Sequence, residues 1–271
     1  MLEHFKFENC NPVKVPMRAN LHLEEAKSPL VSVTKATMLS LVGKGIWLAT
    51  TTRPDIAVAI GNLARSMVEP MEEHWIAAKQ LLRYLRGTVD VGLQFGGGIG
   101  ERHGFNRRTL FAVSDSDWGT DRVDSKSRSG WIVELNGPVH FGSKRQSTVA
   151  LSSTEAEYYA ITEAACDVIA LRMTLSDLGM PMKEPTTIMT DNEGAEKMIK
   201  NPIHHHQTRH IARRMHFPRD HAEKGDIVVV HVPTDENTAD TLTKPLAANK
   251  FWQHFPGLGL VRLAGRGKVL T

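Results

Sequence analysis

The spacing of apolar residues is helical in the first third of the chain. Residues 34–50, 53–67 and 72–88 place apolar side chains three or four positions apart, as a helix with one buried face requires. Gly87 closes the third of these stretches, and glycine commonly ends helices. Residues 1–30 contain three prolines and predict an irregular arm. This part of the chain is therefore predicted to be mainly helical.

After the helical part the pattern changes to short apolar runs bounded by turn residues, which predict strands. The first three runs fall at 109–113, 130–135 and 138–144. The second and third are joined by Asn136-Gly137, a dipeptide that accepts the positive φ of a hairpin turn. Consecutive strands of this kind predict antiparallel pairing.

A long amphipathic stretch follows, with a predicted buried stripe from Tyr158 to Leu178 and Gly179 as its end. Strand-like runs at 186–192 and 226–232 then alternate with helical segments, which predicts parallel pairing. The expected fold is α/β: a mixed five-stranded sheet with flanking helices, preceded by a mainly helical segment.

Residues 94–108, QFGGGIGERHGFNRR, separate the two patterns. Five glycines in a short polar stretch are typical of a flexible linker, and a glycine-rich hairpin is the alternative. The predicted organisation is a helical segment (1–95), a linker (96–108), an α/β domain (109–250) and a C-terminal tail (251–271).

Composition adds limits. The 271 residues suffice for one large or two small domains, and 41% hydrophobic with 23% charged residues is ordinary for a folded protein. A net charge of +3 is too small to indicate a nucleic-acid partner by itself.

No apolar stretch approaches the roughly 18 residues of a membrane span, and no signal-peptide core is present. We therefore expect a soluble intracellular protein without a membrane partner. Two cysteines and no CxxC argue against a thiolate zinc site.

Histidines are concentrated in one place. Six of the 13 lie between His204 and His221, together with several arginines. Such a local basic patch suits contact with phosphates. A solvated helix face is the alternative.

Two aspartates follow predicted strands. Asp115 comes after the apolar run Leu110–Val113, and Asp191 directly follows Thr190. If these strands are neighbours, both carboxylates lie at the sheet edge where open α/β sheets bind ligands. Close carboxylates raise one another's pKa unless a cation offsets them, and Mg²⁺ prefers such oxygen ligands.

Further acids complete the pattern. Glu155 and Glu157 begin the long helix, where one glutamate would join the aspartates and the other would cap the helix. Asp240, in ENTADTL, is a fourth candidate. Singly, such acids are more often turn residues or helix caps. Together, in this order, they indicate a site that holds divalent ions for phosphodiester hydrolysis.

Seven segments carry a resemblance to one family. SDSDWGTDRVDSKSRSGWIVELNGPVHFGSKRQSTVALSSTEAEYYAITEA, TDNEGAEKMIKNP, HHHQTRHIARRMHF and TADTLTKPL resemble the ribonuclease H domain of Copia-type (Ty1/copia) retrotransposon Pol polyproteins. NCNPVKVPM, LATTTRPDIAVAIGNLARSM and EEHWIAAKQLLRYLRGT resemble the end of the reverse transcriptase in the same family, its thumb and connection. The paired aspartates of a polymerase, in a YVDD-like turn, are absent from this sequence, so we do not expect it to polymerise.

The resemblance implies a ribonuclease H-like fold and an endoribonuclease that uses Mg²⁺, or Mn²⁺ in its place, to cut the RNA strand of RNA–DNA hybrids. The implied setting is reverse transcription in cytoplasmic retrotransposon particles, with the rest of Pol as partner. The rival hypothesis is an inactive relic that binds the hybrid without cutting it. The implied catalytic and metal-binding acids are Asp115, Glu157, Asp191 and Asp240. EYYA fits the family frame better than EAEY and favours Glu157, while Glu155 stays open.

Substrate contacts are expected from two segments. The basic motif of the family falls on His205, Arg209, His210, Arg214 and His216, which would contact phosphates of the hybrid. Arg128 and Ser129, in DSKSRSG, lie near the first aspartate and are candidates for reading the RNA 2′-hydroxyl. A polar turn is the alternative for this second segment.

Overall fold

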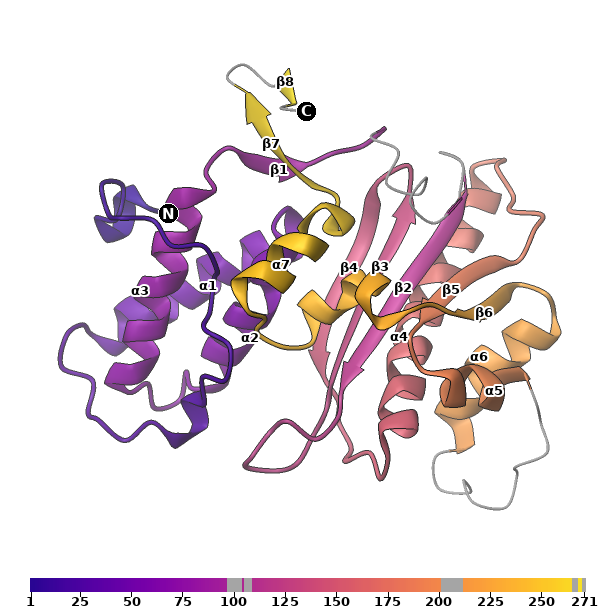
Figure 1. Ribbon diagram of the computed structural model, residues 1–271, viewed down its shortest axis with the longest axis horizontal. Helices are drawn as coiled ribbons and strands as arrows, with labels where there is room; N and C mark the ends of the chain where they lie inside the picture. Colours follow the sequence, from indigo (N-terminus) through magenta and orange to yellow (C-terminus); the bar gives the residue numbers. More distant parts are fainter. Residues whose placement is uncertain (97–103, 105–108, 201–211, 265–267, 270–271) are drawn as a thin grey trace. The chain divides into compact units, whose positions relative to one another are not determined.

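The computed structural model describes residues 1–96, 104, 109–200, 212–264 and 268–269. The chain divides into two compact units, one of Met1–Gln94 with Lys244–Thr271 and one of Phe95–Thr243 (Figure 1). The last part of the chain therefore groups with the first unit. The predicted linker lies largely outside the described residues, and the functional division of the chain stays a prediction. Within the described part, no helix has the length and apolar character needed to cross a membrane.

The first unit contains the predicted helices. They are α1 (Lys35–Thr51), α2 (Ala57–Arg65) and α3 (Glu72–Gly87). The end of the chain adds α7 (Ala248–His254), and short 3₁₀ turns lie at Glu3–Phe5, Leu23–Glu25, Pro54–Ile56 and Phe255–Leu258. Helix α1 begins after Thr34, whose hydroxyl accepts the amide N–H of Thr37 at 3.2 Å. Helix α3 buries Trp75 and Leu85 on its predicted face and ends at Gly87. The helical prediction for this part is confirmed, and residues 1–30 form an arm with only short 3₁₀ turns.

A small antiparallel sheet in the same unit was not predicted. It pairs β1 (Val91–Leu93) with β7 (Leu260–Ala264), and β7 with β8 (Lys268–Val269). Strands so short and so far apart in the sequence carry little pattern of their own.

The second unit is built on the predicted five-stranded sheet, in the order β4-β3-β2-β5-β6 (Figure 1). Its strands are β2 (Leu110–Asp117), β3 (Arg128–Leu135), β4 (Pro138–Arg145), β5 (Thr186–Thr190) and β6 (Ile227–His231). Strands β2, β3 and β4 pair antiparallel, whereas β5 pairs parallel with β2 and β6. The turn between β3 and β4 has positive φ at Asn136 (57°) and Gly137 (135°). The predicted mixed sheet and its hairpin are confirmed.

Three helices pack together in this unit: α4 (Ser153–Asp177), α5 (Glu193–Lys200) and α6 (Ala212–Glu223). Helix α4 lies on β2 and β3, where Tyr158 and Ile161 join Ala112 and Trp131 in the core. The predicted stripe of α4 is buried along most of its length, but Leu178 is exposed. Helix α6 was not predicted from the sequence as a separate element.

The opposite face of β3 receives the segment after β6, which holds the 3₁₀ turns Thr234–Glu236 and Thr238–Leu242. Side chains alternate between faces along a strand, so Gly130 points away from its neighbour Trp131 and from α4. A Cβ on Gly130 would stand 2.8 Å from both Leu242 Cβ and Thr243 Cγ2. Glycine at this position therefore lets the segment come down onto β3, next to Asp115, which pairs with Gly130 in the register.

Candidate metal centre

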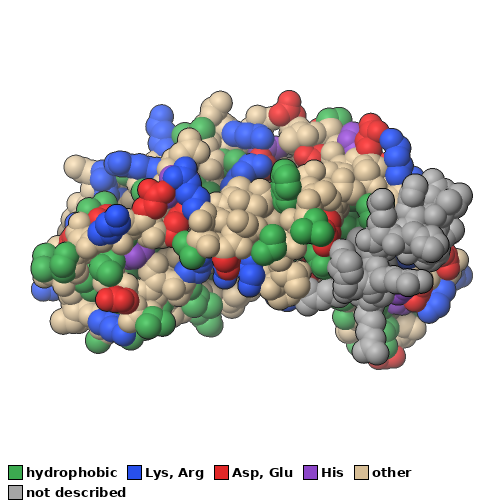
Figure 2. All heavy atoms as spheres, turned by 90° about the horizontal axis from the view of Figure 1, so that it is seen from below, with side chains coloured by type: hydrophobic (Ala, Val, Ile, Leu, Met, Phe, Trp, Pro, Cys, Tyr) green, Lys and Arg blue, Asp and Glu red, His purple; other side chains and the backbone are tan. Residues whose placement is uncertain are grey.

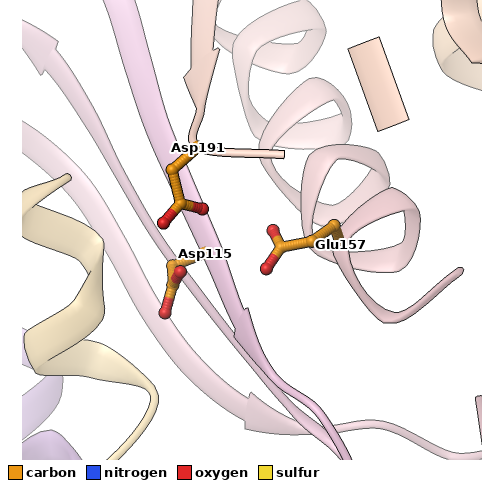
Figure 3. Close-up of side chains that lie close together, drawn as sticks. All are labelled: Asp115, Glu157 and Asp191. Atoms are coloured by element: carbon orange, nitrogen blue, oxygen red, sulfur yellow. The ribbon is translucent and has the colours of Figure 1, made fainter. Parts of the chain in front are cut away.

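Three carboxylates converge at one edge of the five-stranded sheet. Asp115 lies near the end of β2, Asp191 directly follows β5, and Glu157 lies in the second turn of α4. One oxygen from each lies within 4.8 Å of the others, and the three side chains point toward one another (Figure 3). Strands β2 and β5 are parallel neighbours, so their carboxyl ends share an edge. The predicted meeting of the two strand-end aspartates is confirmed.

Asp115 is buried and is oriented by the segment after β6. Its Oδ2 accepts a hydrogen bond of 2.6 Å from the Thr243 hydroxyl, and its Oδ1 accepts one of 3.3 Å from Asn237 Nδ2. Asn237 also donates to the Ser114 carbonyl oxygen at 3.1 Å. Sequence reasoning did not select Asn237 or Thr243, and the only signal for them was their position on either side of Asp240.

Glu157 is buried between the two strand ends. Its Oε1 accepts the Ser116 amide N–H at 3.1 Å, and its Oε2 lies 3.5 Å from the Thr190 hydroxyl. Burial, and after it the negative charges of Asp115 and Asp191, raises the pKa of Glu157 to about 9. Without a cation the cluster therefore retains a proton at neutral pH. The three carboxylates would hold a divalent ion in place of this proton, and its charge would offset their repulsion.

Asp191 is placed by the start of α5. The next residue, Asn192, accepts the Ala195 amide N–H on its Oδ1 at 2.9 Å and so begins the helix. A Cβ on Gly194 would lie 3.0 Å from the Thr154 hydroxyl oxygen, so the first turns of α4 and α5 are close together. This approach brings the helix that carries Glu157 to the end of β5. Asp191 itself is half-buried.

Glu155 has a different environment from Glu157. Its Oε2 accepts the Leu151 amide N–H at 2.7 Å, and its Oε1 accepts a bond of 3.4 Å from the Tyr159 hydroxyl. The Ser152 hydroxyl in turn accepts the Glu155 amide N–H at 3.1 Å. Glu155 thus holds the beginning of α4, while Glu157 belongs to the carboxylate cluster. This arrangement favours Glu157 over Glu155 as the metal ligand.

Asp240, the fourth predicted acid, is buried in the 3₁₀ turn Thr238–Leu242. It is not a member of the group whose oxygens lie within 4.8 Å. Its backbone carbonyl oxygen accepts the Thr243 hydroxyl at 3.0 Å. Because the same hydroxyl donates to Asp115, this turn is connected to the cluster through Thr243. A direct role of the Asp240 carboxylate stays a prediction.

The predicted substrate-binding residues have different surroundings. Arg128 and Ser129 are buried at the start of β3, where Arg128 Nη1 donates to Ser143 Oγ at 3.3 Å and Ser129 Oγ accepts from Gln146 Nε2 at 3.0 Å. His216 is exposed on α6. His205, Arg209, His210 and the side chain of Arg214 lie outside the described residues. Contact of these residues with a nucleic acid stays a prediction.

The donor set fits a hard divalent cation. All three converging ligands are carboxylates, with no imidazole or thiolate among them. Oxygen-only sets of this kind suit Mg²⁺ and Mn²⁺, whereas zinc sites usually include nitrogen or sulfur. The negative charges of Asp115 and Asp191, which add to the effect of burial on the pKa of Glu157, point the same way, since a cation would offset them.

No protein-family model matches the chain. The chain is 36% identical over 262 residues to the retrovirus-related Pol polyprotein from transposon RE2 of Arabidopsis thaliana, covering 94% of this chain and 17% of that protein. It is 37% identical over 257 residues to the corresponding polyprotein from transposon TNT 1-94 of Nicotiana tabacum, covering 93% of this chain and 19% of that protein. The chain thus spans less than a fifth of the length of these relatives.

Two other comparisons cover about half of the chain. Over 134 residues the chain is 43% identical to the secreted RxLR effector protein 161 of Plasmopara viticola, covering 49% of this chain and 89% of that protein. Among solved structures, LC11-RNase H1, isolated from compost by a metagenomic approach, is 18% identical with a TM-score of 0.39. That match covers 50% of this chain and 93% of the other.

Proposed function

The chain belongs to the Copia-type family of retrotransposon Pol polyproteins, and on this premise we propose that Phe95–Thr243 is a metal-dependent ribonuclease H that cuts the RNA strand of RNA–DNA hybrids. The observation that carries the proposal is the convergence of Asp115, Glu157 and Asp191 at the carboxyl ends of β2 and β5. A fold gains no stability from placing three acids so close together, so their approach needs a functional reason.

The acids of the cluster would bind the metal ions, and the residues around them would position these acids. Asp115, Glu157 and Asp191 would hold divalent cations, Mg²⁺ or Mn²⁺, with Asp240 as a further acid nearby. When bound, such ions supply the Lewis acidity that phosphodiester hydrolysis requires. Asn237 and Thr243 donate hydrogen bonds to the two oxygens of Asp115 and keep that carboxylate turned toward the cluster. Water attack would then leave a 3′-hydroxyl and a 5′-phosphate.

The substrate and setting follow from the family. We propose an RNA–DNA hybrid as substrate, reverse transcription in retrotransposon particles as the setting, and the rest of Pol as the partner. The basic motif around His205, Arg209, His210, Arg214 and His216 would contact hybrid phosphates, which position a substrate without reading its sequence. Arg128 and Ser129 remain candidates for the RNA strand only if β3 exposes them on binding, because both side chains are buried.

A comparison of substrates tests this proposal. The purified chain is incubated with Mg²⁺ and an RNA strand, labelled at one end, that is paired with DNA or with RNA, and the product ends are analysed. The proposal predicts cleavage of the hybrid alone, with 3′-hydroxyl ends. Binding of the hybrid without any cleavage would support the inactive relic instead. Equal cleavage of both duplexes would contradict the assignment as a ribonuclease H.

A further inference from the structure

An exposed tryptophan follows directly on the strand that carries Asp115. Strand β2 ends at Asp117, and the next side chain, Trp118, is 55% exposed. We propose that Trp118 is a stacking platform for an unpaired base of the nucleic acid, at a single-stranded segment that adjoins the hybrid being cut. This inference rests on the proposed function and adds a binding site to it.

The position of Trp118 places it beside the carboxylate cluster. The Ser116 amide N–H donates to Glu157 Oε1 at 3.1 Å. Trp118 lies two residues further along, so its Cα is within about 7 Å of the Cα of Ser116. A nucleotide next to the scissile phosphate spans a similar distance. The ring is therefore within reach of the same nucleic acid that the cluster would bind.

The indole ring is held in place from outside its strand. Trp118 Nε1 donates to the Ala150 carbonyl oxygen at 3.2 Å. Ala150 is buried in a small cluster with Ala156 and Tyr159 of α4. The next amide, that of Leu151, donates to Glu155 Oε2 at 2.7 Å. Glu155 is thus a positioning residue, because it fixes the segment that fixes the indole, and a ring already held in one orientation loses little entropy on binding.

The bond to Ala150 leaves only the ring faces for a ligand, because the single polar hydrogen of the indole is already used. Val149 and Leu151, on either side of Ala150, are 45% and 77% exposed. The exposed apolar surface of Trp118, Val149 and Leu151 together is far smaller than the roughly 800 Å² that each partner buries in a stable protein interface. A protein is therefore not the expected occupant. Figure 2 shows hydrophobic side chains scattered among charged ones on the face it displays, without one large apolar surface.

A base is the ligand that suits an isolated aromatic face. Bases stack on aromatic side chains with little regard to sequence. Inside a duplex both faces of a base are covered by its neighbours, so only a base outside the helix can stack on Trp118. The occupant is therefore a single-stranded nucleotide next to the hybrid.

Two hybrids of equal duplex length test the inference, one blunt and one with a single-stranded DNA extension. Their Kd values are measured by fluorescence anisotropy with Ca²⁺ in place of Mg²⁺, and their cleavage by the wild type is measured with Mg²⁺. The extension is expected to tighten binding of the wild type roughly tenfold, as one stacked base would. Trp118→Ala should abolish this gain, Trp118→Phe should keep part of it, and Glu155→Gln should reduce it.

Trp47→Ala is the matched control, since Trp47 on α1 is 65% exposed and should leave both Kd values unchanged. An equal loss of affinity for both hybrids in Trp118→Ala, or no loss for either, would overturn the stacking site. That result can be told apart from a failure of the proposed function, which would appear as a wild type that does not cut the blunt hybrid with Mg²⁺, whether or not it binds the hybrid.

Discussion

Replacing Glu157 with glutamine should stabilise the metal-free protein even though it removes a metal ligand. In the folded protein burial and the charges of Asp115 and Asp191 raise the pKa of Glu157 from 4.5 to about 9. The unfolded chain has the ordinary pKa. Between these two pH values the folded protein holds a proton that the unfolded chain has released. This contribution to stability is complete below the unfolded pKa and is lost as pH rises toward the folded pKa.

The size of the effect follows from the width of that pH window. Each pH unit within it lowers the free energy of unfolding by about 1.4 kcal/mol. From pH 4.5 to 7 the wild type therefore loses about 3 kcal/mol through Glu157. A glutamine has the size of the protonated glutamate and carries no charge at any pH, so the variant does not lose it. At pH 7 without metal, Glu157→Gln should be more stable than the wild type by up to about 3 kcal/mol.

Urea unfolding in EDTA at pH 5, 7 and 8.5 measures this difference. Glu155→Gln is the matched control, because Glu155 lies two positions before Glu157 on the same helix, is not part of the cluster, and accepts the Leu151 N–H instead. That variant should lose about 1 kcal/mol through the weakened hydrogen bond to the Leu151 N–H. Added Mg²⁺ should stabilise the wild type and do so much less for Glu157→Gln. If Glu157→Gln is no more stable than the wild type at pH 7 and 8.5 in EDTA, the electrostatic account of the cluster is refuted.

Three other predictions concern single buried residues. Burial raises the pKa of Glu134 to about 8, so the free energy of unfolding of the wild type should fall as pH rises from about 5 to 8. In urea unfolding the free energy of Glu134→Gln should fall less over this range. Parallel pH dependences of the two proteins would contradict this prediction. Thr243→Val removes the hydroxyl that donates to Asp115 at 2.6 Å and should weaken Mg²⁺-dependent cleavage roughly 10- to 100-fold. The cleavage rate is measured as a function of Mg²⁺ concentration, and a curve equal to that of the wild type would contradict this prediction. Asp55→Asn breaks a buried pair with Arg53 at 2.7 Å and should cost about 3 kcal/mol by thermal unfolding; a wild-type Tm would show that the pair contributes nothing.

Local patterns predicted most of the sheet and the three converging acids. Apolar runs marked the strands of the second unit, and Asn136-Gly137 marked its hairpin through the positive φ that both residues adopt. The meeting of Asp115 and Asp191 was predictable because each ends a strand and parallel neighbours share an edge. Helical spacing alone left Glu155 and Glu157 open and the family frame favoured Glu157; in the structure Glu157 lies in the cluster, whereas Glu155 accepts the Leu151 N–H.

Features that depend on contacts between distant parts of the chain could not be predicted from the sequence. Helix α6 contains Pro218 and few apolar residues, and its packing against α4 and β6 compensates for its weak pattern. Strand β1 pairs with β7, about 170 positions away in the sequence, and the pattern of neither short strand predicts this pairing. Strand β3 begins at Arg128, two residues before its apolar run, because pairing with Asp117 extends the ladder. This extension buries Arg128 and Ser129, for which the sequence predicts either a contact with the RNA 2′-hydroxyl or a polar turn.

Cleavage of an RNA–DNA hybrid with an end-labelled RNA strand, by the wild type and by Asp191→Asn, tests the central claim most directly. The account predicts that the wild type cuts the RNA with Mg²⁺ and not with EDTA. Asp191→Asn should bind the hybrid and leave the RNA intact, while Glu163→Gln, a change at a half-buried residue of α4 that pairs with Lys144 and lies outside the cluster, should cut like the wild type. Mg²⁺-dependent cleavage that survives in Asp191→Asn would contradict the assignment of the carboxylate cluster as the active site.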